Sequence, residues 1–248
     1  MRKLLIASAS AVVLFSAAGA QAQTVGHIGA NYSHVDADVA GFDAKNDVFE
    51  AEGAVAFDAG SAGIALDGSV ADSDDFDAVW TATGHANVKY GAARIGGFAG
   101  VQTTDGDTLW AVGAEGQTDL APSTVLYGQG GYGQIDDLDV DLWGVRGELR
   151  QYVGANIKLT GSLGYVNADF GPFKIDGWNA GIEGEYQFKN TPFSVFGGWA
   201  HADSNDLDAN TDTLQVGVRF TFGGATLRSR DAAGASLSGV NKLFVGVQ

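Results

Sequence analysis

The chain contains four histidines and no cysteine, which limits the catalytic chemistry open to its side chains. The zinc-binding pattern H-E-x-x-H and the nucleophile pattern G-x-S-x-G are both absent. His34 and His201 have the same predicted orientation, but Ser33 would point to the opposite side of its strand, and no orienting partner is apparent. The sequence therefore predicts no catalytic residue, and we expect a protein that is not an enzyme.

Two further patterns are too incomplete to define a site. Gly128–Gly133 (GQGGYG) is rich in glycine like a phosphate-binding loop, but it lies within a predicted strand and opens no helix. Asp206–Asp212 (DLDANTD) has the oxygen-ligand spacing of a calcium loop without the glycine and terminal glutamate of an EF-hand. We predict no cofactor and no metal centre. The many loop carboxylates are interpreted as a solvated rim that attracts cations, with weak divalent binding as the alternative.

A set of charged residues recurs at alternate positions of the predicted strands, on the face opposite to the bulky apolar residues. In a membrane barrel, a Lys or Arg that faced lipid would cost roughly 2 to 4 kcal/mol at the bilayer midplane. Such residues would therefore face a lumen, where opposite charges either create a transverse field or pair into a closed polar plug. The predicted lumen-lining residues are Glu50, Glu52, Asp67, Lys89, Arg94, Glu115, Arg146, Glu148, Arg150, Lys158, Glu183, Glu185 and Arg219.

The elements that carry these residues alternate apolar and polar side chains with a period of two, which predicts strands wetted on one side only. In Asp212–Phe222 the Leu, Val and Phe residues share one face, and the Thr, Gln and Arg residues share the other. We predict twelve strands, at residues 24–36, 48–58, 63–71, 78–90, 93–102, 109–118, 124–132, 140–151, 157–165, 175–188, 193–202 and 212–222. The abundant aromatic residues exclude a disordered linker, so the chain is predicted to be an ordered all-β protein.

The predicted connections alternate between short turns and longer acidic loops. The longer loops are residues 36–47, 72–77, 103–108, 135–139, 167–174 and 203–211. Pro122, Pro172 and Pro192 all fall in connections, where a missing amide proton breaks no ladder hydrogen bond. An even number of strands of about 9 to 11 residues, joined in this way, predicts a transmembrane up-and-down antiparallel β-barrel. The barrel must close, because an open edge in hydrocarbon leaves amides unsatisfied.

Aromatic residues gather at the two ends of the predicted strands, on the apolar face. The end beside the longer loops holds Trp80, Trp110, Trp143, Trp178, Trp199, Tyr32, Tyr132 and Tyr165. The opposite end holds Phe57, Tyr90, Phe188, Phe193 and Phe222. Two aromatic girdles separated by an apolar band are expected at the two interfaces of a membrane, whereas a soluble sandwich has no reason to sort its tryptophans to one level.

The start of the chain and its charge indicate where the protein acts. Arg2 and Lys3 precede an apolar run and Ala20-Gln21-Ala22, so residues 1–22 are predicted to be a secretory signal peptide. The formal net charge of the whole chain is −16, which makes nucleic acid an implausible partner. Without cysteine, the exported protein cannot be a disulfide scaffold.

The strand Asp212–Phe222, an apolar ladder that ends on a phenylalanine, resembles the closing strand of a Gram-negative outer-membrane β-barrel. With the strand repeat, the whole of Thr24–Phe222 resembles a small porin or porin-like barrel. The resemblance implies a location in the cell outer membrane with both termini periplasmic. It also implies outer-membrane lipid, lipopolysaccharide and the barrel-assembly machinery as partners, and leaves the oligomeric state open.

The organisation expected from the sequence is a signal peptide at 1–22, a transmembrane barrel at 23–222 and a tail at 223–248. The tail is rich in Gly, Ala and Ser, and most of its charged residues are basic. It is interpreted as a periplasmic tail or as a lumen plug that pairs with the glutamates, and extra strands are a third alternative. The first functional hypothesis is passive diffusion of small polar solutes or ions. The second is a non-conducting structural or surface-binding barrel.

Overall fold

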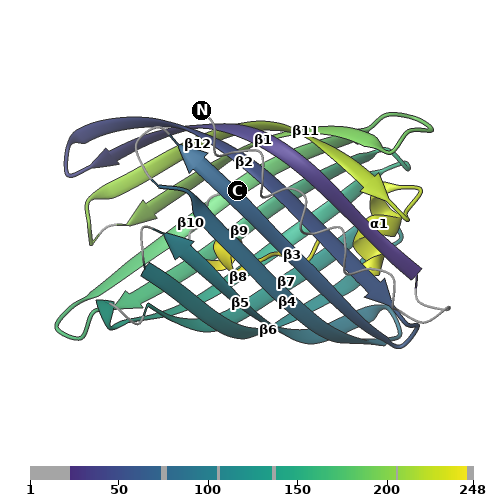
Figure 1. Ribbon diagram of the computed structural model, residues 1–248, viewed down its shortest axis with the longest axis horizontal. Helices are drawn as coiled ribbons and strands as arrows, with labels where there is room; N and C mark the ends of the chain where they lie inside the picture. The colour runs from purple at the N-terminus through teal and green to yellow at the C-terminus, as the bar shows by residue number, and fades with distance from the viewer. Residues whose placement is uncertain (1–22, 74–76, 105–106, 136–137, 205, 245–248) are drawn as a thin grey trace.

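The computed structural model describes residues 23–73, 77–104, 107–135, 138–204 and 206–244. The predicted signal peptide lies outside the described residues. Within them, twelve antiparallel strands follow one another around a closed barrel, and β1 pairs with β12 (Figure 1). The strands are β1 (Gln23–Val39), β2 (Phe42–Asp58), β3 (Ala62–Ser73), β4 (Val79–Tyr90), β5 (Ala93–Thr104), β6 (Asp107–Ala121), β7 (Thr124–Ile135), β8 (Val140–Val153), β9 (Ile157–Asp169), β10 (Lys174–Gln187), β11 (Phe193–Ser204) and β12 (Ala209–Phe222). The prediction of a twelve-stranded up-and-down barrel is confirmed.

The strands are longer than predicted, and the first hairpin shows why. β1 and β2 each have 17 residues and continue through the segment predicted as a loop at 36–47, so that only Ala40 and Gly41 form the turn. Lys45 pairs with Asp36 at 2.7 Å, and His34 pairs with Asp47 at 2.7 Å. Outward-facing charges pair with one another across the hairpin, so the ladder continues beyond the apolar band. The prediction of a long loop here is wrong for that reason.

The wall has two chemically distinct faces, because successive side chains of a strand point to opposite sides. On β12, Leu214 and Val216 are both 60% exposed on the outside, whereas Thr213 and Arg219 are buried on the inside. The outside of the barrel is therefore apolar. No helix of the described residues is long and apolar enough to cross a membrane.

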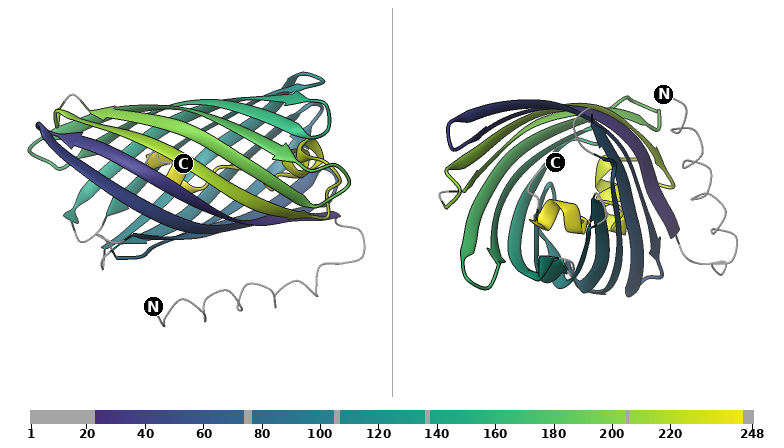
Figure 2. Two further views of the ribbon diagram at one scale, coloured as in Figure 1. Left: turned by 90° about the horizontal axis from the view of Figure 1, so that it is seen from above. Right: turned by 60° about the vertical axis from the view of Figure 1, so that its left-hand side comes forward.

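Beyond β12 the chain turns back into the barrel at Gly223. This glycine has a φ of +73°, and a Cβ atom there would lie 1.9 Å from the carbonyl oxygen of Thr24, so a larger residue would not fit without a shift of the backbone. Two short helices follow, α1 (Leu227–Ala233) and α2 (Val240–Phe244). Both lie inside the barrel, α1 at the end where β1 begins and α2 near the middle of the lumen (Figures 1 and 2).

Candidate functional site: the barrel lumen and its C-terminal tail

The strands place the predicted charged residues on the inner face of the wall. Eight of them are buried, and the other five are partly buried. The buried ones are Arg94, Glu115, Arg146, Glu148, Arg150, Lys158, Glu185 and Arg219, and the partly buried ones are Glu50, Glu52, Asp67, Lys89 and Glu183. The interior of the barrel is therefore densely charged, and its charges form several local networks.

The first network surrounds Arg219 on β12. Its guanidinium donates to Glu52 at 2.5 Å, to Glu185 at 3.2 Å and to Glu183 at 3.4 Å, so that it links β2 to β10. The same group lies 3.7 Å from the ring centroid of Phe196. Arg219 is therefore held in one position by three carboxylates and an aromatic face, as suits a rigid planar cation.

The second network joins Glu148 on β8 to its two strand neighbours on the same face. Glu148 accepts a hydrogen bond from Arg146 at 3.1 Å and from Arg150 at 2.7 Å. Arg150 also lies 4.8 Å from the centroid of the Tyr127 ring. Consecutive inward positions of one strand thus form a line of alternating charge along the lumen.

The third network centres on His85, for which the sequence offered no specific signal. One ring nitrogen lies 2.7 Å from Asp67 and the other lies 3.0 Å from Glu115, which also accepts a hydrogen bond from Tyr127. Both ring nitrogens face carboxylates, so the imidazole bridges β3 and β6. Lys89 lies apart from these networks and pairs with Asp58 beside the short turns.

The tail adds ionic contacts that the sequence did not assign to individual residues. Arg230 donates two hydrogen bonds to Glu185, at 2.8 and 2.7 Å, and Asp231 accepts one from Tyr152. Burial by itself raises the pKa of Asp231, but the nearby positive charges of Lys158, Arg230 and Arg150 hold it well below the usual range of a carboxyl group. The only sequence signal for these contacts was the basic composition of the tail opposite a glutamate-rich wall.

Polar contacts continue along the extended part of the tail. Ser238 donates to Glu148 at 2.7 Å, and the amide of Val240 donates to Thr83 at 3.1 Å. Arg150 donates to the carbonyl of Ser236 at 2.9 Å. Arg94 donates to the carbonyl of Ala233 at 3.2 Å, so backbone groups of the tail that would be unsatisfied in a buried position have partners on the wall.

The apolar side chains of the tail pack against apolar positions of the inner wall. Val240 and Leu243 are fully buried, and Phe244 is 8% exposed. Together with Phe98, Leu109 and Ala111 of the wall they form one cluster, here called the apolar patch. At the end of the barrel beside the short turns, Leu227 packs against Val125 and Tyr152.

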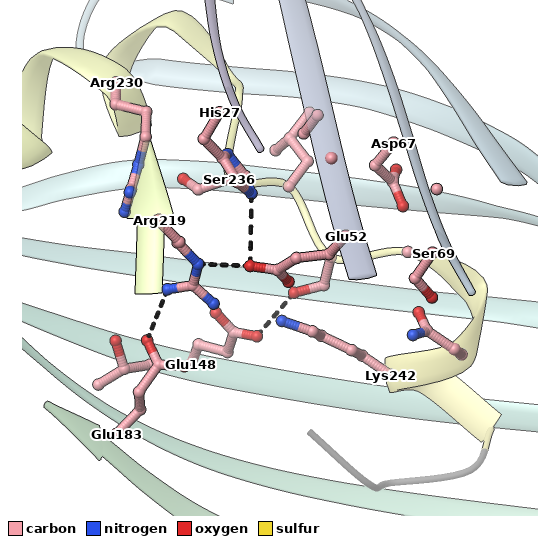
Figure 3. A pocket seen from close by; sticks show the side chains of 18 of the residues that line it. His27, Glu52, Asp67, Ser69, Glu148, Glu183, Arg219, Arg230, Ser236 and Lys242 are labelled. Atoms are coloured by element: carbon pink, nitrogen blue, oxygen red, sulfur yellow. Dashed lines mark hydrogen bonds and ion pairs between the residues drawn. The ribbon is translucent and has the colours of Figure 1, made fainter. Parts of the chain in front are cut away.

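A cavity of about 90 Å³ remains between the tail and the wall (Figure 3). On the wall it is lined by residues of β1–β3, β8–β10 and β12, and on the tail by residues of α1 and of the segment 236–242. The predicted residues that line it are Glu50, Glu52, Asp67, Glu148, Arg150, Lys158, Glu183 and Arg219. Lys242 of α2 extends into it toward Glu52 (Figure 3). Lys89, Arg94, Glu115, Arg146 and Glu185 lie outside its lining.

The outer wall carries the aromatic residues predicted as a girdle. Trp80, Trp143 and Trp178 are between 41% and 47% exposed, and Tyr132 is 41% exposed. Ring contacts connect Trp110 to Tyr132, Trp143 to Tyr165, and both Trp178 and Trp199 to His201, with centroids 5.2 to 6.1 Å apart. The rings thus form a partial belt across β6–β11 toward the end of the barrel where β1 ends.

Among the described residues, no group of three or more His, Asp or Glu side chains is placed to hold a metal ion. The contacts described above are ion pairs and hydrogen bonds between fixed charges. A closed antiparallel barrel with an apolar, aromatic-belted exterior and a charged interior is the architecture of outer-membrane channels.

Comparison with solved structures finds that architecture. The KdgM porin in complex with disordered oligogalacturonate has a TM-score of 0.58 and 9% identity, with 78% of this chain and 99% of that chain covered. An outer membrane channel from Pseudomonas putida F1 has a TM-score of 0.58 and 10% identity, with 83% and 97% covered. The translocator domain of the autotransporter NalP from Neisseria meningitidis has a TM-score of 0.53 and 13% identity, with 83% and 90% covered. The chain therefore shares the barrel fold of outer-membrane porins and channels.

Sequence comparisons add nothing to this relationship. No family model matches the chain, and no curated protein sequence matches it. At identities of 9 to 13%, the structural likeness establishes the fold.

Proposed function

We propose that the protein is a porin-like channel of the outer membrane, through which small polar solutes or ions diffuse passively. The observation that carries the proposal is the cavity beside the tail, which is lined by fixed charges of both signs. A structural wall alone would not need a charged, water-sized space in its interior. The barrel fold shared with outer-membrane porins and channels supports the same function.

The arrangement of charge around the cavity suggests how solutes are sorted. Glu50, Glu52 and Asp67 project from β2 and β3. Arg150 and Lys158 project from β8 and β9, six strands away in the closed order. Glu148 and Glu183 line the cavity beside these two cations, so an acidic wall faces a wall of mixed charge. This asymmetry creates a transverse field that orders water and discriminates solutes by charge and dipole.

The size of the cavity restricts what can pass while the tail is in place. Pockets that enclose a ligand of drug size have volumes of about 300 to 1,000 Å³. The cavity of about 90 Å³ holds several water molecules or a small ion but no larger solute. Passage of anything larger would require the tail to move, so the tail is proposed to act as a lumen plug.

The membrane setting completes the proposal. The apolar outer wall and its aromatic belt fit a bilayer, and lipopolysaccharide and outer-membrane lipid are the proposed surroundings. The start of β1 and the end of β12 would face the periplasm, whereas the tail turns back from there into the lumen. Insertion would use the barrel-assembly machinery. The outward carboxylates of the β1–β2 hairpin and its one lysine, Lys45, would lie above the lipid, where a charge is not penalised.

Single-channel currents in planar bilayers test the function through Glu50. This residue lines the cavity, and its carboxylate accepts a hydrogen bond from Asn31 at 3.0 Å. Glu50→Gln keeps the shape of the side chain and removes its charge. A unit charge at 4 Å contributes about 1 kcal/mol in water, so we expect the cation-to-anion permeability ratio to fall by up to roughly fivefold.

The matched control is Asp43→Asn, which removes one charge from the exposed β1–β2 hairpin, away from the cavity. It should leave the permeability ratio nearly unchanged at physiological salt, where exposed charges are screened beyond about 8 Å. A conducting barrel whose selectivity is the same in Glu50→Gln and in the wild type would show that ions do not pass along this surface.

A non-conducting structural barrel is the second candidate, and the packing of the tail favours it. The tail fills the lumen with apolar contacts and pairs with the charges of the wall. Bilayer recordings separate the two candidates. Discrete current steps support the channel, whereas silence from a correctly folded, heat-modifiable barrel supports the structural role.

A further inference from the structure

Two adjacent residues of the tail carry opposite charges and are its most deeply buried polar groups. Arg230 and Asp231 are each 1% exposed. Arg230 forms a two-pronged contact with Glu185, and Asp231 accepts a hydrogen bond from Tyr152 and lies 3.9 Å from the ammonium of Lys158. The tail thus presents a cation and an anion side by side to one region of the wall.

The wall groups that receive this pair are direct neighbours in the strand register. Tyr152 on β8 is opposite Lys158 on β9, and Lys158 is opposite Glu185 on β10. Ser194 of β11 donates to Glu185 at 2.7 Å and fixes its carboxylate. Because all four residues lie on paired strands, the strand register sets their backbone positions.

These wall residues form two complementary subsites. Glu185 accepts from a planar, bidentate cation such as a guanidinium, which is the geometry that Arg230 adopts. Tyr152 and Lys158 offer a hydroxyl and an ammonium to a carboxylate, which Asp231 supplies. The ammonium of Lys158 lies 3.2 Å from Glu185, so a ligand must carry its two charges close together to occupy both subsites.

The subsites adjoin the cavity. Arg230 and Lys158 are among the residues that line it, so water or a small ion in the cavity meets the edge of this contact, and a larger solute reaches it once the tail moves. We infer that Tyr152, Lys158 and Glu185 form a binding site for zwitterionic solutes that carry a guanidinium or ammonium group beside a carboxylate. The Arg230–Asp231 pair of the tail occupies this site as an internal ligand. The inference rests on the proposed channel function only in assuming that such solutes reach the lumen.

The Arg230–Asp231 pair of the tail and a free zwitterionic solute would compete for this site. A tethered ligand has an effective concentration in the millimolar range when its linker allows it to reach the site, so the tail excludes free solute from the native site at lower concentrations. Removing the two tail side chains uncovers the site without shortening the chain. A solute with only one of the two charges fills only one subsite.

The test uses the full chain folded in detergent micelles, with guanidinobutyrate as the zwitterionic probe and butylguanidine and butyrate as the single-charge probes. In the Arg230→Ala, Asp231→Ala double variant we expect calorimetry to show guanidinobutyrate binding at least tenfold more tightly than in the wild type, and more tightly than either single-charge probe. Arg228→Ala is the matched control. Arg228 pairs with Asp119 at the rim and lies 5.3 Å from the ring centroid of Tyr152, but it does not touch the Tyr152 hydroxyl, which Asp231 still covers when Arg228 is lost. Equal binding of the three probes, or equal gains in the double variant and in Arg228→Ala, would overturn the inference.

A second measurement applies if the double variant does not reach the heat-modifiable folded form. The chain has no cysteine, and Ala235 is fully buried in the tail, so Ala235→Cys reports displacement of the tail through its rate of thiol labelling. Guanidinobutyrate should accelerate labelling severalfold, and butyrate at the same concentration should not. An unchanged rate would contradict the inference.

Binding in micelles does not require conduction, so the two proposals can fail separately. A barrel that binds guanidinobutyrate but carries no current in bilayers would retain the site and lose the channel function. A barrel that conducts but shows no preference for the zwitterion would retain the channel and lose the site.

Discussion

Two regions of the inner wall meet the same tail in opposite ways. The apolar patch around Leu243 is buried, with wall residues of β5 and β6 against α2. On the charged side, β9 and β10 meet the tail through ion pairs, and a cavity beside the tail is lined by β1–β3, β8–β10 and β12. The difference indicates that one region anchors the tail, whereas the other positions it and keeps a polar space open.

Energetic considerations support this division. Full burial of a Leu or Val side chain contributes about 1.5 to 3 kcal/mol, and both Val240 and Leu243 are fully buried. A buried ion pair such as that between Arg230 and Glu185 must first offset the desolvation of both charges, so its net contribution is small even though losing one partner is costly. The apolar patch should therefore supply most of the free energy of docking, and the ion pairs should define the position.

The largest expected effect comes from a charge in the apolar patch. Leu243→Asp loses the packing of a buried leucine, worth about 2 to 5 kcal/mol relative to alanine, and must also desolvate a carboxylate. Since 1.4 kcal/mol is a factor of ten, the docking equilibrium of the tail should fall by more than about tenfold. Single-channel recordings should show a clear rise in conductance over the wild type.

Asn241→Asp is the matched control, because it adds the same charge to the same helix on the side that lines the cavity. There the carboxylate borders the cavity near Lys242 but also faces Asp67, so docking should weaken far less than in Leu243→Asp. If Asn241→Asp raised the conductance as much as Leu243→Asp does, added charge rather than lost apolar packing would release the tail, and the proposed division would be wrong.

The same contrast explains what the sequence could reveal. The wall follows from local alternation, because the face of each strand residue is set by its parity, and this alone predicts the inward charges and the outward tryptophans. The tail carries no such signal. Its helices have 7 and 5 residues, well below the length at which a helix is stable in isolation, and they exist through contacts with distant strands.

Two features of the structure, one ion pair of the lumen and the length of the first hairpin, could not be predicted from the sequence for related reasons. Arg230 and Glu185 are 45 positions apart, and a single sequence contains no signal that selects Glu185 over the other inward glutamates as the partner. The long first hairpin was missed because Asp36 and Lys45 look like loop residues until their pairing across the strands is known. Periodicity predicted the wall, whereas tertiary contacts determine what fills it.

A smaller, pH-dependent effect on the free energy of unfolding is expected at Asp231, where the tail meets the charged wall. Hydrogen bonds to charged groups contribute about 1.5 to 3 kcal/mol, so Asp231→Asn should lower the free energy of unfolding by about that amount at neutral pH. The pKa of Asp231 is lower in the folded protein than in the unfolded chain, because Lys158, Arg230 and Arg150 outweigh the effect of burial. Its contribution is therefore fully present above the unfolded pKa of about 3.9 and is lost as the pH falls through the lower folded value.

Denaturant titrations of both proteins in micelles between pH 7 and pH 2 measure this contribution. The difference between wild type and Asp231→Asn should be constant down to about pH 4 and should shrink in stronger acid. A difference that disappeared near neutral pH would mean that Asp231 is not held ionised by the charged wall. The ion pairs would then not be what positions the tail.

The smallest effect is expected at the rim, where the tail has a contact of a third kind. Arg228 donates to Asp119 at 2.9 Å, but the two side chains are 30% and 42% exposed. Exposed pairs contribute about 0 to 1 kcal/mol and are screened by salt. Arg228→Ala should therefore change the free energy of unfolding by less than about 1 kcal/mol and leave the conductance unaltered. The difference in unfolding free energy between Arg228→Ala and the wild type should vanish in about 1 M salt, where the screening length is about 3 Å. A loss comparable to that of Leu243→Asp would place the anchor of the tail at the mouth of the barrel instead of at the apolar patch, and the lumen contacts would then follow from an attachment made at the rim.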